Sequence, residues 1–422
     1  MKTLHITNAY HGTSGGIRTF YHALLDGANR ERRQVVLVVP GTHEEMREVG
    51  SYARIYTLPA PRAPLFDRRY RLILPTHYAP VLRRRLVTVL ERERADLVEI
   101  CDKYSLPYLA AMLRKGWHPH VPRPTLVGLS CERFDDNMAA YLSRSDAAQA
   151  FTRWYIHDIY GPPFDFHVAN SQYTAEELRS ALPERAPGFI RVCVMGVDVG
   201  AFDPARRSVE MRERLLRLVG GGDRSALLLY AGRLSPEKNL ELLVETLRTL
   251  VAENGRDYRL VVAGDGPRAQ WLREQARGPL QGRIFLSGNL DRATLATCYA
   301  SCDVFLHPNP REPFGIGPLE AMASGVPVVA PAAGGVLEYA NAGNAWLAPP
   351  HADDFATAVR HAVTVGDSQK IRAALATARA FGWEAATRRY FDLYDELHDR
   401  RQHGYRNTSS SQRLGSAVAG GA

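Results

Sequence analysis

Short runs of apolar, mostly β-branched residues alternate with segments of helical periodicity along most of the 422-residue chain. Apolar runs of this length, separated by helices, are typical of parallel sheets in α/β proteins. The predicted strands form two series, at 4–7, 35–39, 97–100, 125–129 and 166–169, and then at 227–231, 260–263, 284–286, 304–306 and 326–329. Ten strands are too many for one comfortable sheet, so we expect two α/β domains, which suits roughly 100 to 200 residues per domain.

The stretch 191–204, with Gly196-Val197-Asp198, is typical of a hinge and predicts domains over 1–195 and 196–382. A further helix is predicted over 383–402, because apolar residues recur on one face of it. These residues are Trp383, Ala386, Tyr390, Tyr394 and Leu397. The tail 403–422 is rich in Ser, Gly and Ala and is predicted to be disordered.

Composition narrows the class of protein. The N-terminus has no apolar core of a secretory signal, and no apolar run approaches the ~20 residues of a membrane span. The five cysteines have no metal-ligand spacing and predict a cytoplasmic protein; they are Cys101, Cys131, Cys193, Cys298 and Cys302. The net charge of +8 favours anionic partners such as phosphates, anionic lipid or nucleic acid, without choosing among them.

Gly15-Gly16-Ile17 follows the first predicted strand and opens a helix. A glycine pair lets the backbone come close to a ligand, and the helix N-terminus behind it suits a phosphate. A plain strand-to-helix turn is the alternative. The pair is not G-x-G-x-x-G, so it supports a dinucleotide site only weakly.

Two further loops follow strands of the second series. Arg233 and Lys238 lie on one loop at the carboxyl end of a strand, where α/β domains bind ligands, and two cations there could hold a diphosphate. A solvated basic loop is the alternative, although only five of the 53 cations in the chain are lysines. Gly264-Asp265-Gly266-Pro267 predicts a tight turn that could form one wall of a base pocket.

The segment from Glu312 to Glu320 carries the strongest signal. Pro318 suits the first turn of a helix that stops at Gly325, and the glycines before it leave backbone N–H groups bare as an anion cradle. Glu320 would then lie in the first helical turn, able to accept hydrogen bonds from a ribose diol, and Glu312 would face a bound sugar. Two surface acids that flank a loop are the alternative.

Together, and in this order, these motifs resemble the retaining, nucleotide-sugar-dependent GT-B glycosyltransferases of family 4. The resemblance extends from Thr3 to about Asp399 and is similar in detail to bacterial mannosyltransferases that act on phosphatidylinositol. It implies two Rossmann-like domains facing across a cleft, with the donor mainly on the C-terminal domain and the helix 383–402 crossing back to the N-terminal one. A hexose, with mannose favoured, would pass from a GDP- or UDP-sugar to a lipid or glycan acceptor.

The resemblance also implies site residues. Arg233 and Lys238 would neutralise the leaving diphosphate, with no metal or other cofactor expected. Glu320 would hold the ribose and Glu312 would contact the donor sugar. The other donor-binding positions implied are Gly15, Gly16, Gly264, Phe314, Gly315, Ile316 and Leu319.

One position departs from the family pattern. Cys131 stands after a middle strand where the family usually has a histidine near the donor sugar. Cysteine gives only a weak hydrogen bond, so either the backbone carbonyl acts there, or Glu132 or Asp102 contributes, or activity is lost. A covalent nucleophile is a further alternative, although nothing near Cys131 in sequence identifies an activating base.

The acceptor side is predicted over 62–94, which has nine arginines among three acids and several apolar residues. Such a surface could lie on an anionic membrane at its inner face, and a solvated helix face is the alternative. Nucleic acid is not expected, since no recognised module accompanies the charge. The predicted acceptor residues are Tyr10, Arg68, Arg69 and Asp102.

Two other functions stay open at this point. The cysteine at position 131 is compatible with a non-catalytic sugar-nucleotide-binding partner of another transferase. A sugar-nucleotide epimerase of the same fold would form product without an acceptor.

Overall fold

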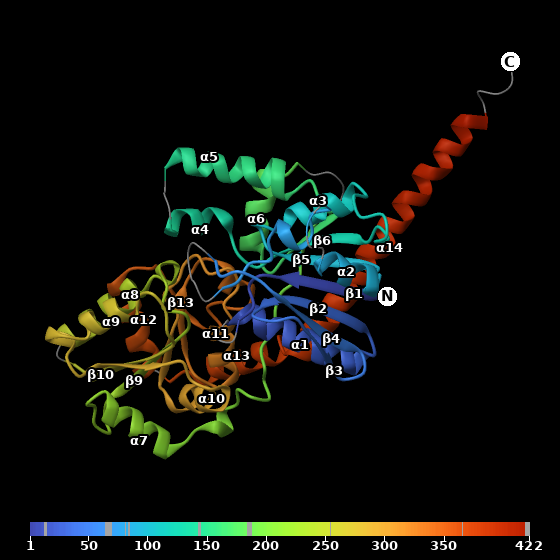
Figure 1. The fold of residues 1–422 in the computed structure, drawn as a ribbon. Helices are drawn as coiled ribbons and strands as arrows, with labels where there is room; N and C mark the ends of the chain where they lie inside the picture. Colours follow the sequence, from blue (N-terminus) through green and yellow to red (C-terminus); the bar gives the residue numbers. More distant parts are fainter. Residues whose placement is uncertain are drawn as a thin grey trace.

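The computed structural model of the chain describes residues 1–11, 15–63, 70–80, 82, 85–141, 145–183, 188–253, 255–364 and 366–417, with side chains described as far as residue 403. Two separate sheets, each covered by helices, form two domains (Figure 1). The predicted fold class, two Rossmann-like α/β domains, is confirmed.

The N-terminal domain has an eight-stranded sheet in the order β3-β4-β2-β1-β5-β6-β7-β8. All neighbouring strands are parallel except the pair β3 and β4. The central strands β1, β2 and β5 are buried on both faces because helices cover both sides, which is why they consist of near-continuous apolar runs. The strands are β1 (Lys2–Thr7), β2 (Gln34–Gly41), β3 (Glu45–Val49), β4 (Ala53–Pro59), β5 (Leu97–Cys101), β6 (Thr125–Ser130), β7 (Phe166–Ala169) and β8 (Ile190–Val192). The helices are α1 (Gly16–Glu31), α2 (Arg85–Glu93), α3 (Pro107–Arg114), α4 (Phe134–Tyr141), α5 (Asp146–Trp154), which continues as a π-helical segment (Tyr155–Tyr160), and α6 (Gln172–Ala181).

The C-terminal domain has a six-stranded parallel sheet in the order β11-β10-β9-β12-β13-β14. Its strands are β9 (Ala226–Ala231), β10 (Tyr258–Ala263), β11 (Ile284–Gly288), β12 (Val304–Leu306), β13 (Val328–Pro331) and β14 (Trp346–Ala348). Its helices are α7 (Val209–Leu218), α8 (Leu240–Ala252), α9 (Ala269–Gln275), α10 (Arg292–Ser301), α11 (Ile316–Ala323), α12 (Ala352–Thr364) and α13 (Ser368–Ala380).

The chain crosses between the domains twice, and the two crossings lie side by side. Val197 N–H donates to the Phe381 carbonyl at 2.9 Å, and Trp383 N–H donates back to the Val197 carbonyl at 3.0 Å. Gly196 is required here because a β-carbon would lie 2.7 Å from the Trp383 ring. The predicted boundary between residues 195 and 196 falls within the first crossing.

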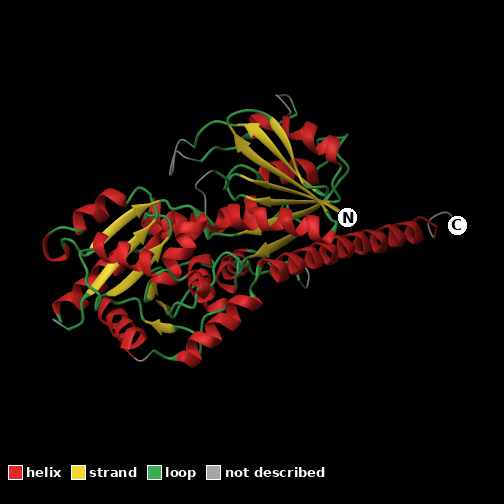
Figure 2. Cartoon of the chain, turned by 90° about the horizontal axis from the view of Figure 1, so that it is seen from below, coloured by secondary structure: helices red, strands yellow, loops and turns green. Residues whose placement is uncertain are grey.

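The last helix, α14 (Trp383–Ala417), is the long helix that ends near the C-terminus in Figure 2. It returns to the N-terminal domain and packs against α1 and β6. Tyr394 donates a hydrogen bond to the buried Glu99 of β5, and Arg33 forms an ion pair with Asp395. The predicted end of this helix at residue 402 was too early, since the helix continues to residue 417 within the predicted disordered tail. A helix satisfies its own backbone, so it can propagate where no apolar face marks it in the sequence.

All ten predicted strands are present, with ends within two residues of those expected. The sequence prediction missed four strands. β3 is charged and exposed at the sheet edge, β8 and β14 have three residues each, and β4 mixes buried and half-buried residues instead of forming a continuous buried run. No helix of the described residues is long and apolar enough to cross a membrane.

Candidate active site

The order of the strands reverses at one point in each sheet, between β1 and β5 in the first and between β9 and β12 in the second. Ligands of open α/β sheets bind beside such a point, at the carboxyl ends of the strands. The predicted cations follow β9 and the Glu312 segment follows β12. The topology therefore brings the two strongest sequence motifs to one edge of the second sheet.

Residues 232–238, which we call the cation loop, carry Arg233 and Lys238 directly after β9. Lys238 Nζ lies 2.9 Å from Oε1 and 2.8 Å from Oε2 of Glu312, so the ammonium bridges both carboxylate oxygens. Arg233 points toward the other domain, where it donates to the Tyr70 hydroxyl and its guanidinium carbon lies 5.2 Å from the Tyr70 ring centre. The structure thus brings Lys238 and Glu312 into contact, which the sequence did not predict, and directs Arg233 toward the other domain.

The glycines of the predicted turn after β10 allow the cation loop to lie against it. Gly264 has φ +147°, and a β-carbon there would lie 1.9 Å from the Gly232 carbonyl oxygen. At Gly266, a β-carbon would lie 2.3 Å from the carbonyl oxygen of Leu234, which accepts a hydrogen bond from Arg268 N–H. Any side chain at these glycines would push the cation loop away, so the turn acts as a support for that loop.

Glu312 is held as a carboxylate by its neighbours. Burial raises its pKa, but the charge of Lys238 and hydrogen bonds from Lys238 and Asn309 outweigh burial and lower the pKa to about 2. His307, at the end of β12, lies 3.9 Å from Glu312 Oε2. Burial lowers the pKa of His307 to about 4, so a neutral imidazole faces the carboxylate at neutral pH. Sequence analysis missed His307 and Asn309, although their position just after a strand was a signal for both.

Gly315 starts α11 in a left-handed conformation, with φ +83°. Across the cleft, a β-carbon on Gly16 would lie 3.1 Å from Ile316 Cδ1, so the start of α1 meets the start of α11. Phe314 and Leu319 are buried in the core, so their side chains do not line the cleft as a direct donor contact would require. The predicted donor contacts of Phe314, Gly315 and Ile316 are backbone contacts, and they stay predictions.

Glu320 differs from Glu312 in its electrostatics. It is the fifth residue of α11, just past the first turn where it was predicted, and Tyr299 donates a hydrogen bond to its Oε2 at 3.1 Å. Burial raises the pKa of Glu320 to about 7, against the lowering effects of Tyr299 and Arg292. The two carboxyl groups of one motif therefore have pKa values moved in opposite directions, because among the described residues only Glu312 has a cation in contact, Lys238.

Cys131 is buried beside Cys101 at the ends of β6 and β5. The Cys101 thiol and burial raise the pKa of Cys131 well above its ordinary value. A thiol kept protonated in an apolar setting is a poor nucleophile, so the structure disfavours the covalent alternative.

Asp102 is occupied inside the N-terminal domain. Its Oδ2 accepts N–H groups from Ser105 at 2.7 Å and Leu106 at 2.8 Å, and its Oδ1 accepts from the Asn8 amide at 3.2 Å. These bonds give it a structural task at the start of α3, and its predicted contact with an acceptor stays a prediction. Tyr10 Oη lies 2.9 Å from His22 Nε2 at the side of α1. Arg68 and Arg69 lie outside the described residues, and Gly15 precedes α1 as its N-cap.

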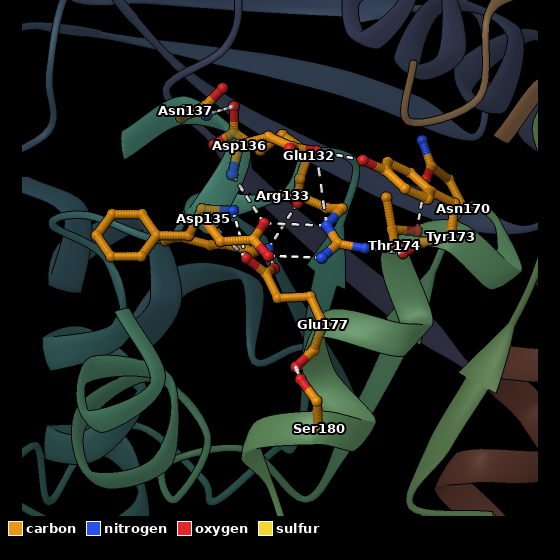
Figure 3. Close-up of polar contacts among 12 residues, drawn as sticks. Glu132, Arg133, Asp135, Asp136, Asn137, Asn170, Tyr173, Thr174, Glu177 and Ser180 are labelled. Atoms are coloured by element: carbon orange, nitrogen blue, oxygen red, sulfur yellow. Dashed lines mark hydrogen bonds and ion pairs between the residues drawn. The ribbon is translucent and has the colours of Figure 1, made fainter. Parts of the chain in front are cut away.

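Glu132, the proposed substitute for the missing histidine, belongs to a polar network at the start of α4 (Figure 3). Its Oε2 accepts from the Asn137 amide at 3.0 Å, while Glu177 accepts the N–H groups of Phe134 and Asp135 at 2.5 and 2.9 Å. Burial raises the pKa of Glu132, opposed by the charge of the buried Lys103. The network fixes the direction of α4, which lies against the cation loop of the other domain.

Comparison with known proteins identifies the family of the chain. The family described as Glycosyl transferases group 1 matches residues 219–377, which contain the cation loop and the Glu312–Glu320 segment. The chain is 31% identical to a GDP-mannose-dependent alpha-(1-6)-phosphatidylinositol dimannoside mannosyltransferase of Mycobacterium tuberculosis, over 92% of this chain and 94% of that one. It is 26% identical to a GDP-mannose-dependent alpha-mannosyltransferase of Corynebacterium glutamicum, over 81% and 75% of the two chains.

Solved structures show the same fold at low sequence identity. Sucrose-phosphate synthase from Thermosynechococcus elongatus superposes with a TM-score of 0.69 at 19% identity, covering 95% of this chain and all of that one. Anabaena HepE in complex with UDP-glucose gives 0.67 at 18% identity, covering 94% and 100%. With the mycobacterial relative matched over nearly its whole length, the chain belongs to the group 1 glycosyltransferases and is an enzyme of the GT-B fold that transfers a glycosyl group.

Proposed function

We propose that the enzyme transfers mannose from GDP-mannose to a lipid or glycan acceptor, with retention of the anomeric configuration. The observation that carries the proposal is the Lys238–Glu312 pair on one side of the cleft with Arg233 beside it on the same loop. Two cations suit a diphosphate, and a carboxylate next to them suits the hydroxyls of a sugar. The printed names of the two mannosyltransferase relatives support GDP-mannose as the donor.

In this proposal catalysis is electrostatic, because the enzyme holds positive charge next to the leaving diphosphate. Arg233 and Lys238 stabilise the negative charge that grows on the diphosphate as the glycosidic bond breaks. An ammonium has three N–H donors, so Lys238 can keep one bond to Glu312 while it binds phosphate. Glu312, ionised at neutral pH, accepts hydrogen bonds from hydroxyls of the donor sugar, and Glu320 accepts hydrogen bonds from the ribose diol.

The acceptor step needs a group that removes a proton. Cys131 gives only a weak hydrogen bond, and we propose that the leaving phosphate itself takes the proton of the acceptor hydroxyl. No metal is expected to take part. Cytoplasmic location, and contact of the enzyme with an anionic membrane at its inner face, stay predictions.

The test is a donor screen on the purified chain. GDP-mannose, GDP-fucose, UDP-glucose and UDP-galactose are compared by thermal shift, because a ligand that binds only the folded state raises the melting temperature. Nucleotide release is then measured with and without a phosphatidylinositol mannoside acceptor, and the anomer of the product is assigned by NMR. We expect GDP-mannose alone to give a shift and an α-linked product.

Each other outcome rejects a stated part of the proposal. A shift with UDP-sugars only rejects the donor, and a β-linked product rejects retention. Isomerised donor without acceptor would identify the epimerase alternative. Turnover that appears only with a second protein would identify the non-catalytic alternative, which the comparisons do not favour.

A further inference from the structure

Two tyrosines of the N-terminal domain reach across the cleft to the cation loop. Tyr70 accepts a hydrogen bond from Arg233 Nη2, and its ring lies under the guanidinium. Tyr141, at the end of α4, donates to Glu237 Oε2 at 2.7 Å, and Ser235 donates to the other oxygen of that carboxylate. Both ends of the loop that carries the two cations are thus bonded to the opposite domain.

Tyr70 is held rigidly at its own base. Residues 61–63 pair with 70–72, with Ala63 N–H donating to the Tyr70 carbonyl at 2.9 Å and Leu72 N–H to Pro61 at 2.9 Å. The next residue, Ile73, donates its N–H to the Asn8 side chain at 2.8 Å, and its carbonyl accepts the Ser105 hydroxyl at 2.8 Å. Asn8 and Ser105 follow β1 and β5, so the segment that carries Tyr70 is anchored at the carboxyl ends of these two strands.

Tyr141 has an equally fixed base. It ends α4, whose first turn is held by Glu177 through two backbone N–H groups (Figure 3). Asp136 on the same helix accepts the Tyr173 hydroxyl at 2.6 Å and lies 3.9 Å from Arg311 of the C-terminal domain. Burial and the charge of Glu237 raise the pKa of Tyr141, which keeps the hydroxyl a hydrogen-bond donor to Glu237.

The chemistry of the Tyr70 contact suits a cation that must later bind phosphate. A guanidinium has five N–H donors in a fixed plane, and a bond from one of them to a hydroxyl orients that plane. A hydroxyl is neutral, so it directs Arg233 without cancelling its charge. The contact of Lys238 is with the carboxylate of Glu312.

From this geometry we propose that Tyr70 and Tyr141 are positioning residues that hold the cation loop from the acceptor-side domain, Tyr70 through Arg233 and Tyr141 through Glu237. The proposal rests on the proposed function, since it assigns Arg233 to the leaving diphosphate. It adds that the grip on the diphosphate forms fully only when the two domains are in contact.

The experiment is a double-mutant cycle on the full chain with Y70F, R233Q and the double variant Y70F/R233Q. Calorimetry measures the affinity for GDP and for UDP, and turnover is measured with the nucleotide sugar that is active in the screen. In wild-type background Y70F is expected to weaken binding of the nucleoside diphosphate about three- to ten-fold, which matches the loss of one hydrogen bond to a charged group. We expect kcat to fall by a similar factor with the donor KM changed less than about two-fold, since the departing diphosphate carries more charge than the bound donor.

The R233Q background separates positioning from a structural role. If Tyr70 acts through Arg233, adding Y70F to R233Q changes affinity and kcat less than about two-fold. The same test applies to Y141F in an E237Q background. Y52F is the matched control, because Tyr52 directly precedes β4, at the edge of the sheet opposite the cleft, and is expected to leave every value unchanged.

The failures are distinguishable. Equal losses from Y70F in both backgrounds, or no loss in either, overturn the assignment of Tyr70, and the same results for Y141F overturn that of Tyr141. Wild-type protein that binds neither GDP nor UDP overturns the proposed function, and the positioning role with it. Melting temperatures are recorded for each variant, and the cycle is run at a temperature where all of them are folded.

Discussion

The two sheets reverse their strand order in the same way, yet the strand ends beside the reversal serve different purposes. In the N-terminal domain Asn8, Asp102 and Ser105 bond to one another and to backbone groups. In the C-terminal domain the corresponding strand ends carry the Lys238–Glu312 pair, with a neutral His307 beside it.

This difference shows that topology supplies the location of a site and side chains supply its chemistry. The first domain uses its strand ends to hold Tyr70 and α3 in place. The second keeps charged groups there that a substrate can engage. The two domains share one strand topology, and among the described residues the paired charges lie at the strand ends of the second.

Removing Lys238 from the strand ends of the C-terminal domain is the strongest test of the difference between the two domains. We expect Lys238→Met to lower turnover about 10²- to 10³-fold, because the charge that we propose stabilises the leaving group is lost. It also leaves Glu312 buried without its partner, at a cost to stability of about 3–5 kcal/mol. Turnover is measured by nucleotide release and stability by urea unfolding.

The double variant K238M/E312Q separates the two effects of that substitution. Neutralising both partners is expected to restore much of the stability and none of the turnover. Lys115→Met, at an exposed lysine of the N-terminal domain, is the control and should match wild type. Activity of K238M near the wild-type level would contradict the assigned role.

A substitution at the strand ends of the N-terminal domain should lower the free energy of unfolding more than it lowers turnover. Asp102→Asn weakens a carboxylate that accepts several N–H groups, and we expect unfolding free energy to fall by about 1–3 kcal/mol. Turnover per folded molecule should stay within about three-fold of wild type. Loss of turnover at unchanged stability would instead support the predicted acceptor role of Asp102 and remove the contrast between the two sites.

Glu320 gives a pH test within the second site. Its pKa of about 7 means that the group is protonated below neutrality and ionised above it, and only the ionised form accepts strongly from a diol. Affinity for GDP-mannose should therefore rise a few-fold between pH 6 and pH 8. Glu320→Gln should bind weakly at both pH values, and a wild-type affinity that does not change with pH would rule out this contact.

Substitution of Cys131 should have the smallest effect on turnover. A buried, protonated thiol is not needed for charge placement, so Cys131→Ala is expected to keep turnover within about three-fold of wild type. Mass spectrometry of the enzyme during turnover should show no covalent glycosyl adduct. An adduct at position 131 would reverse the conclusion drawn from its burial.

Local sequence determined more of the fold than of the site. Apolar runs such as 166–169 and 304–306 matched their strands, because burial between helices leaves a continuous apolar signal. The glycines at 264 and 266 were correctly placed in a turn, but their reason, contact with the cation loop, depends on residues some thirty positions away. Edge strands such as β3 have no such signal.

Prediction of the active site from sequence was limited in the same way, because its properties depend on residues that are distant in the chain. Spacing identified Glu312 and Glu320, but nothing local could predict that one pKa moves down and the other up, since Lys238 lies 74 positions from Glu312. Tyr70 and Tyr141 have no distinguishing neighbours in sequence. Their significance comes entirely from the partner domain across the cleft.

The C-terminal helix has a consequence for how the protein is made. Glu99, fully buried in β5, has His5 Nδ1 and the Tyr21 hydroxyl within 3.0 and 2.8 Å of one oxygen, and its other oxygen is met by the Tyr394 hydroxyl. Tyr394 leaves the ribosome almost three hundred residues after Glu99. The core of the N-terminal domain can therefore be completed only after nearly the whole polypeptide has been synthesised, although this domain is synthesised first. If translation ends early in the C-terminal domain, the buried Glu99 lacks the hydrogen-bond donor that Tyr394 supplies.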